Sequence, residues 1–321
     1  YESLPSLAFQ RGSIEHIVHM MKEAKWGAGR IRRRLSEVSI ELVLTAHPTE
    51  AQRRSILEKL FTINHLLIER ELRLMTPREL LEIDGKIIRE ITLLWQTDEL
   101  RRRQQTPLDE VDHMLFYLDL LFETLPATLI HFERELQRKF HKDIPVGPLL
   151  RFGSWVGGDR DGNPHVTSEV TFQALRRQKE AVLRNYIQYL DRLIAEASQS
   201  VELVGATEEL LHSIREDTEA LPLFAETMKQ KSQKEVYRKK FSFIQRKLIN
   251  TLRRNAPLET RQTASDKTLE AAYEDAEEFQ RDLTLVKHSL KKHRGNLLAE
   301  GEFRQLEIAV ELFGFRFSKL D

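Results

Sequence analysis

Three short apolar segments, separated by long stretches of helical periodicity, constrain the fold of this chain most strongly. The segments lie near 41–45, 150–155 and 314–320, and each is expected to form a β-strand. Gly and Pro are sparse, at 13 and 10 of 321 residues, so long uninterrupted helices can form between the strands. The sequence therefore predicts a mainly helical chain with a few short strands.

A loop and a helix follow each of the first two strand segments. Such strand–loop–helix units favour parallel pairing, and in a parallel barrel the loops at the carboxyl ends of the strands carry function. We therefore expect the fold class to be mainly α with a few short parallel β-strands, as a partial (β/α)8 barrel with long helical insertions. Three strands cannot close a barrel of eight, so the chain is interpreted as part of a longer protein.

Apolar residues at helical spacing predict the helices between the strands. Two helices are expected over 50–75 and 78–104, each turning one apolar stripe toward the core. The stripes are Ile56, Leu60, Ile63 and Leu67 in the first, and Ile87, Ile91, Leu94 and Trp95 in the second. Two shorter helices are expected before the first strand, one from Ser13 to a break at Gly27 and one from there to about Ser36. Further helices are expected from 107 onward and over 168–200, 206–220, 233–254 and 266–293. The stretch 255–266 is expected to be a loop.

Charge and composition exclude several classes of partner. Lys and Arg together number 50, as do Asp and Glu, so no net charge favours nucleic acid or an acidic membrane surface. Basic clusters such as Arg238–Lys240 are interpreted as ordinary helix faces. No apolar run approaches the roughly 20 residues of a membrane-spanning helix. Cysteine is absent, which excludes disulfides and thiolate metal sites, and we expect a cytoplasmic protein.

A polar loop carries His47 immediately after the first predicted strand. Pro48 breaks the backbone there, and Thr49 with Gln52 three residues later forms a capping-box pattern for the next helix. A histidine in such a loop can act as a general base or as an electrophile near neutral pH. The alternative is a structural histidine bonded to a backbone carbonyl.

Arg53 and Arg54 follow on the first turns of that helix. Adjacent helical residues point about 100° apart, so the pair cannot easily grip one small anion from the same side. Either one faces a ligand while the other pairs elsewhere, or both frame a phosphate with a third arginine, or both lie on a solvated helix face. The arginines of Thr97–Arg103 either complement the end of a helix dipole or meet Arg53 and Arg54 in space.

The most distinctive loop, 155–164, contains paired glycines and alternating charges. Glycine permits close backbone approach and positive φ. The oxygen donors Asp159, Asp161 and Asn163 suggest a calcium loop, but an EF-hand requires Gly and Glu at positions that here hold Pro and Val. We therefore expect this loop to position the wall of an active site rather than to bind a metal.

Two of these stretches resemble the signature motifs of one enzyme family. The stretch 44–55, LTAHPTEAQRRS, and the stretch 152–167, FGSWVGGDRDGNPHVT, are similar in sequence and order to motifs of phosphoenolpyruvate carboxylase. Two weaker stretches, 97–107 and 301–321, agree in order and spacing. The resemblance runs from near Leu35 to the last residue.

The resemblance implies a (β/α)8-barrel enzyme that converts phosphoenolpyruvate and bicarbonate to oxaloacetate and phosphate with Mg2+ or Mn2+. By resemblance, His47 deprotonates carboxyphosphate and holds CO2, and the second motif forms the active-site wall. The wall residues are Trp155, Gly157, Gly158, Asp159, Arg160, Asp161 and Asn163. In plant members, arginines that match Arg53, Arg54 and Arg101 bind a sugar-phosphate activator.

The resemblance also implies what this chain lacks. In the family, the metal-binding carboxylates and the arginine that binds the substrate phosphate follow the position of Asp321, so no metal ligand is expected here. We therefore expect the N-terminal portion of a homotetrameric, cytoplasmic carboxylase, inactive by itself, with exposed strand edges that cause self-association. The alternative is a helical module that binds a phosphate or sugar phosphate for regulation, without catalysis.

Overall fold

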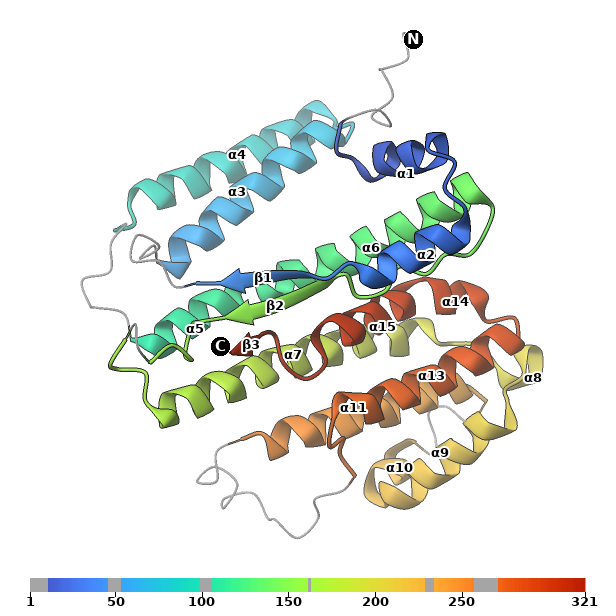
Figure 1. Cartoon of the computed structure of the whole chain (residues 1–321). Coiled ribbons are helices and arrows are strands. Elements are labelled where there is room, and N and C mark those ends of the chain that lie inside the picture. The colour runs from blue at the N-terminus through green and yellow to red at the C-terminus, as the bar shows by residue number, and fades with distance from the viewer. Residues whose placement is uncertain are drawn as a thin grey trace.

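The structure is a computed structural model that describes residues 11–45, 53–98, 106–160, 163–228, 234–256 and 271–320. It consists mostly of helices, with one small parallel sheet (Figure 1). The prediction of a mainly α chain with a few short parallel strands is confirmed.

The sheet has the order β1 (Ile40–Leu44), β2 (Leu150–Ser154), β3 (Lys319–Leu320), and both neighbouring pairs are parallel. Long helical segments separate the strands in sequence, and such crossover connections are what parallel pairing requires. In register, Leu44 lies opposite Ser154, and Ser154 lies opposite Leu320. The carboxyl ends of the three strands therefore lie along one edge of the sheet.

The third strand is shorter than predicted, because β3 covers only two residues of the range 314–320. Gly314 has a φ of 51°, which turns the chain at the end of the preceding helix. The alternating aromatic residues that suggested a longer strand pack as a cluster instead. The ring centroids of Phe313 and Phe317 lie 5.7 and 5.5 Å from that of Phe152 on β2.

The main hydrophobic core includes Phe152 of β2 and is built mostly from long helices, which Figure 1 shows below the strands. They are α7 (Ser168–Glu196), α11 (Val236–Arg254), α13 (Ala276–Lys292) and α15 (Glu302–Phe313). The fully buried Tyr186 of α7 donates its hydroxyl to the carbonyl of Gly314 at 2.7 Å, which joins α7 to the end of α15. The helices α9 (Glu208–Ala220), α8 (Val201–Val204), α10 (Pro222–Met228) and α14 (Asn296–Glu300) complete this side.

The helix predicted from residue 107 onward is two helices, α5 (Pro107–Phe116) and α6 (Leu118–Phe140), which meet at Tyr117. Thr106 caps α5 in a capping box with Asp109, as the Thr-Pro start indicates. Of the described residues, Pro107–Phe140 has the length and composition of a membrane-spanning helix, which the sequence analysis did not expect. Core helices of soluble proteins pass the same test; here 28% of the tested window is buried, including Leu118 and Phe122.

A second, smaller core holds α1 (Ile14–Glu23) and α2 (Ala28–Glu37) against α6. Val18, Ile31 and Leu136 are its most buried members. Ser13 caps α1 through its side chain. The helix α1 ends at Glu23, four residues before the predicted break at Gly27, and α2 ends one residue after the predicted Ser36.

The helices α3 (Arg54–Leu72) and α4 (Pro77–Trp95) form a hairpin beside β1 (Figure 1). The hairpin holds together through Leu66, Ile83 and Ile87, and Thr76 caps α4 in a capping box. The prediction that the apolar stripes of these two helices face the core is wrong for half of their residues. The residues Leu60, Leu67, Ile91 and Trp95 are exposed instead.

Candidate functional site

The two motif loops leave the sheet side by side. The main-chain N–H of Trp155 donates to the carbonyl of Leu44 at 3.1 Å, one residue beyond the register pair of Leu44 and Ser154. The first motif continues from Leu44 and the second continues from Trp155, so both start at the carboxyl edge of the sheet. His47 lies outside the described residues, three positions after Leu44.

A buried serine and a tight turn position Trp155. The Ser154 hydroxyl accepts from the Val156 N–H at 3.0 Å and donates to Met114 Sδ of α5 at 3.3 Å. The N–H groups of Gly158 and Asp159 both donate to the Trp155 carbonyl at 3.0 Å, which closes the turn. Because these bonds fix its backbone, Trp155 presents its indole, 50% exposed, at the edge of the sheet.

Gly157 is the position where this loop requires glycine. Its φ is +79°, and a Cβ atom added there would lie 2.7 Å from Cβ of Ala174 on α7 and 3.2 Å from Cγ2 of Val111 on α5. The second motif therefore lies directly against both helices. The close approach and positive φ that the sequence analysis attributed to the paired glycines are observed at this residue.

The end of the loop leads into α7 through side-chain caps. Asn163 Oδ1 accepts from the His165 N–H at 3.0 Å, and Thr167 Oγ1 accepts from the Val170 N–H at 3.3 Å, which caps the helix. Arg160 is exposed and Asp159 is half-buried, while Asp161 lies outside the described residues.

A divalent ion does not fit the described part of this site. Within the described ranges, no group of three His, Asp or Glu side chains could hold a metal ion. Asn163 uses its side-chain oxygen to accept a backbone N–H, so it serves the turn.

Arg53 and Arg54 point to different partners. Arg53 is the N-cap of α3, so the helix begins four residues later than the predicted start at 50. Arg53 Nη2 lies 3.6 Å from Asp98 Oδ2, whereas Arg54 Nε lies 2.8 Å from Glu58 Oε1. The Arg54 guanidinium also lies over the ring of Phe116, 5.6 Å from its centroid.

These contacts separate the two arginines of the pair. The two guanidinium groups do not converge on one point, as expected for adjacent helical residues. The Asp98 contact places the segment after α4 beside Arg53, whereas the sequence left open whether the arginines of Thr97–Arg103 meet Arg53 and Arg54 or complement the end of a helix dipole. Arg101 of that cluster lies outside the described residues, as does the Thr49–Gln52 capping pattern.

A cavity of about 640 Å3 lies away from this edge, beside the first residues of β2. It reaches the start of α13 and the end of α15, and side chains of both signs line it, among them Glu41, Arg151, Glu311, Arg316 and Lys319. Burial raises the pKa of Glu311. Sequence reasoning did not identify this cavity, although each of β1 and β2 carries one charged residue, Glu41 and Arg151, within an apolar run.

The chain is similar to one family of proteins along its whole described length. The phosphoenolpyruvate carboxylase family matches residues 3–321. A phosphoenolpyruvate carboxylase of Nitrosomonas eutropha is 38% identical over 288 residues, which is 89% of this chain and 30% of the relative. That of Roseiflexus castenholzii is 37% identical over 303 residues, or 92% and 31%. That of a Synechocystis species is 34% identical over 323 residues, or 97% and 31%. The chain thus spans about a third of the length of these curated relatives.

Proposed function

Because this chain belongs to the phosphoenolpyruvate carboxylase family, we propose that it supplies one wall of a carboxylase active site. The reaction joins phosphoenolpyruvate and bicarbonate to give oxaloacetate and phosphate, which replenishes the tricarboxylic acid cycle. The proposed residues are His47, Trp155, Gly157, Gly158, Asp159, Arg160, Asp161 and Asn163.

The hydrogen bond from Trp155 to Leu44 carries this proposal. It joins the starts of both family motifs at the carboxyl edge of a parallel sheet, where enzymes of this class of fold place their chemistry. The hydrogen bonds of Ser154 and of the Trp155 carbonyl fix the backbone of residues 154–159, so a substrate would meet a preformed surface in this part of the edge.

His47 is proposed to handle the proton in the second half of the reaction. When bicarbonate attacks the phosphoryl group, the products are carboxyphosphate and the enolate of pyruvate. An imidazole that accepts the carboxyl proton of carboxyphosphate promotes its cleavage to CO2 and phosphate, and the enolate carbon then attacks CO2. Trp155 and the glycine turn are proposed to shield the enolate from protonation by water.

The family implies Mg2+ or Mn2+, which would neutralise charge on the phosphoryl group and the enolate. The described residues do not fit such an ion, so no step above is assigned to it. Its ligands are proposed to come from other parts of the enzyme.

We propose further that the three strands are part of a larger (β/α)8 barrel. β1 lies at the sheet edge, and its Leu42 and Val43 are exposed, as they would be where a further strand is due to pair. We also propose a cytoplasmic location and a homotetrameric enzyme, with phosphoenolpyruvate and bicarbonate as the only substrates.

Replacement of His47 tests the catalytic assignment in an enzyme that contains the whole barrel. His47→Asn should abolish oxaloacetate formation while circular dichroism and assembly stay unchanged. His65→Asn, on the exposed side of α3, is the matched control and should keep full turnover. Unchanged oxaloacetate formation in His47→Asn would exclude the proposed role.

A regulatory anion site is the second candidate, and the approach of Asp98 to Arg53 favours it. That contact places the residues before Arg101 beside the arginine pair, so three arginines are proposed to bind a phosphate or sugar phosphate. Calorimetric titration of the chain with a hexose phosphate should give heat that disappears in Arg53→Ala. Absence of heat in the unaltered chain would reject this candidate and leave the catalytic one untouched.

A further inference from the structure

The helix α7 carries a row of buried residues on the side that faces the body of the fold. Ala174, Gln178, Val182 and Tyr186 recur every four residues, and none of them has exposed surface. Residues at this spacing lie one above the other on one side of a helix, about 6 Å apart along its axis. The row is therefore one straight surface against which other segments pack.

Two segments of the carboxyl edge of the sheet contact neighbouring positions of this row. A Cβ atom added to Gly157 would lie 2.7 Å from Cβ of Ala174, so the turn of the second motif lies against α7 there. One helical turn further on, Gln178 contacts Ser318, the residue before β3, where α7 passes beside that strand (Figure 1). The motif turn and β3 are thus placed by the same face of one helix.

The contact with Ser318 consists of two hydrogen bonds to one oxygen atom. Gln178 Oε1 accepts from the main-chain N–H of Ser318 at 3.0 Å and from its hydroxyl at 3.2 Å. Both residues are buried, with 0% and 2% of their surface exposed. A buried main-chain N–H without a partner destabilises a fold, so Gln178 supplies an acceptor at the point where β3 begins.

The other end of the same amide indicates that the oxygen atom is the group that the fold uses. Gln178 Nε2 is buried and has no hydrogen-bond acceptor among the residues that the structure describes. A buried donor without an acceptor is unfavourable and rare in folded proteins. An apolar side chain would fill the row without this penalty, as Val182 does four residues later. The bonds that Oε1 accepts offset the unused donor.

The strand β3 is short, so its pairing with β2 specifies its register only weakly. It pairs with β2 at two positions, Lys319 and Leu320. A slip by one residue would turn each side chain of β3 to the wrong face of the sheet. The contact of Phe317 with Phe152 buries apolar surface, but such contacts are non-directional. A hydrogen bond has a defined distance and direction, so the bonds to Gln178 oppose such a slip.

We propose that Gln178 is a positioning residue of the proposed active site. It holds β3 at a fixed height beside the turn of the second motif, because one row of α7 contacts both segments. The carboxyl ends of β2 and β3 then lie level at the edge where Trp155 and the first motif begin. Gln178 touches no reacting atom and acts through β3. The inference rests on the proposed function only in taking this edge as the place of the chemistry.

Hydrogen exchange of the chain tests whether Gln178 holds β3. Gln178→Met keeps an unbranched side chain of similar length but removes the accepting oxygen. The main-chain amides of 315–320 should then exchange roughly tenfold faster, since the segment opens more often when a buried hydrogen bond is lost. Tyr189→Phe is the matched control, because it removes another buried hydrogen bond of α7, at 2.8 Å to the carbonyl of Phe122. That variant should leave the exchange of 315–320 unchanged.

The products of the reaction test the positioning role in an enzyme that contains the whole barrel. The enolate either forms a carbon–carbon bond to CO2, which gives oxaloacetate, or takes a proton from water, which gives pyruvate. Phosphate is released in both cases. A misaligned edge should admit water, so the share of pyruvate should rise in Gln178→Met. A displacement of about 1 Å should also lower kcat roughly ten- to hundred-fold.

The share of pyruvate separates positioning from a loss of stability, because it does not depend on how much of the enzyme is folded. Tyr189→Phe should lower the melting temperature by a similar amount and yet keep the product ratio and kcat of the unaltered enzyme. Unchanged exchange in Gln178→Met would overturn the proposal. So would an unchanged product ratio at full kcat, or an equal rise of pyruvate in both variants.

Failure of the proposed function gives a different pattern of results. In that case the unaltered enzyme forms no oxaloacetate, or His47→Asn leaves turnover unchanged. The active-site part of the inference is then rejected as well, whereas the exchange of 315–320 in Gln178→Met still decides whether Gln178 fixes the register of β3.

Discussion

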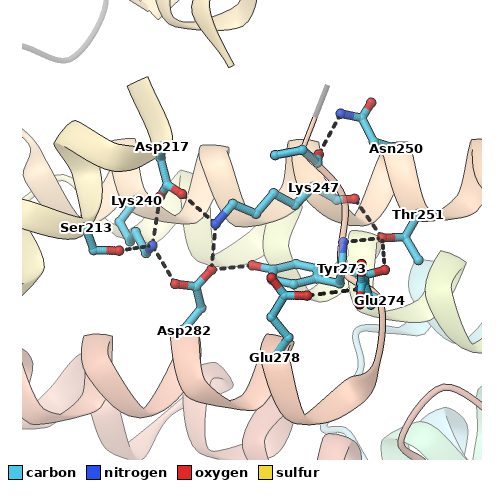
Figure 2. A network of polar contacts seen from close by, with 11 residues as sticks. Ser213, Asp217, Lys240, Lys247, Asn250, Thr251, Tyr273, Glu274, Glu278 and Asp282 are labelled. Atoms are coloured by element: carbon cyan, nitrogen blue, oxygen red, sulfur yellow. Dashed lines mark hydrogen bonds and ion pairs between the residues drawn. The ribbon is translucent and has the colours of Figure 1, made fainter. Parts of the chain in front are cut away.

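Lys240 Nζ lies 2.6 Å from Asp282 Oδ1 in a part of the core where the lysine has no exposed surface (Figure 2). The same ammonium group lies 2.7 Å from Asp217 Oδ2, and Lys247 bridges the same two aspartates from the next turns of α11. Two buried cations thus balance two buried anions.

This network of buried charges connects three helices and the segment that precedes α13. Asp217 comes from α9, both lysines come from α11, and Asp282 comes from α13. The hydroxyl of Tyr273 donates to Asp282 Oδ2 at 2.6 Å, which holds the segment that precedes α13 (Figure 2). Each charged group has partners, so the network is closed and serves packing rather than ligand binding.

Removal of one cation should destabilise the fold strongly. Lys240→Met leaves two buried aspartates against one lysine, and loss of one partner in such a network costs about 3–5 kcal/mol. Urea denaturation should show this loss, whereas Lys234→Met, at an exposed ion pair with Glu202, should cost under about 1 kcal/mol. Adding Asp217→Leu to Lys240→Met should recover part of the stability; no recovery would argue against charge imbalance as the cause.

The network should make stability insensitive to pH over the neutral range. Burial alone would raise the pKa of Asp282, but Lys240 and Lys247 outweigh it and lower the pKa below its ordinary 3.8. Burial alone would lower the pKa of Lys247, but Asp282 and Asp217 raise it above 10.5.

The signs of these shifts set the pH window. Because the pKa of Asp282 is lowered in the folded state, its ionised form stabilises the fold at pH values above 3.8. This stabilisation is lost as the pH falls through the pKa of the folded state. Because the pKa of Lys247 is raised in the folded state, its protonated form stabilises the fold at pH values below 10.5. This stabilisation is lost as the pH rises through the pKa of the folded state. The difference in unfolding free energy between the unaltered chain and Lys247→Met should stay constant from about pH 5 to 9 and shrink outside that range. A steady slope between pH 6 and 8 would contradict this expectation.

Gly157→Ala should destabilise the second motif. The added methyl group meets Ala174 at 2.7 Å in a backbone with φ of +79°, and strain with overpacking costs about 1–3 kcal/mol. Gly147→Ala is the control, because nothing lies within 4 Å of its added Cβ. Thermal unfolding of both variants measures the difference, and equal melting temperatures would show that the loop moves freely away from α5 and α7.

Asp98→Asn should strengthen anion binding at Arg53 if the regulatory candidate is right. The carboxylate 3.6 Å from Arg53 Nη2 competes with any phosphate, and its neutralisation frees the guanidinium. Affinity for a hexose phosphate, measured by calorimetry, should rise roughly two- to five-fold, since an exposed ion pair is worth under about 1 kcal/mol. Glu58→Gln is the matched comparison at Arg54, and lower affinity in Asp98→Asn would show that Asp98 itself orders the site.

The sequence predicted the positions of the strands and helices better than it predicted which surfaces these elements pack against. The strands β1 and β2 were predicted within a residue, because apolar runs end there at polar loops. Periodicity failed in the hairpin, since it identifies residues suited to burial without identifying what buries them: Trp95 was expected inside and is exposed. The aromatic alternation near Phe315 predicted a strand, but those rings form a cluster with Phe152.

For the site, local chemistry could be predicted and long-range contacts could not. Positive φ and close packing at Gly157 follow from a glycine pair after an apolar strand. The approach of Asp98 to Arg53 joins residues on either side of two helices, and nothing local indicates it. The interpretation of Arg238–Lys240 as an ordinary helix face was wrong for Lys240. Its seven-residue spacing from Lys247, on the same side as Phe243 and Ile244, was the signal that a buried pair was present.

The ion pair between Arg53 and Asp98 has a mechanical consequence for the α3–α4 hairpin. Arg53 precedes α3 and Asp98 follows α4, and their side-chain atoms lie 3.6 Å apart, so the contact closes the base of the hairpin. A hairpin that is closed at its base tends to move as one unit, and a shift of α4 is passed to Arg53, at the start of α3 and next to the first motif loop.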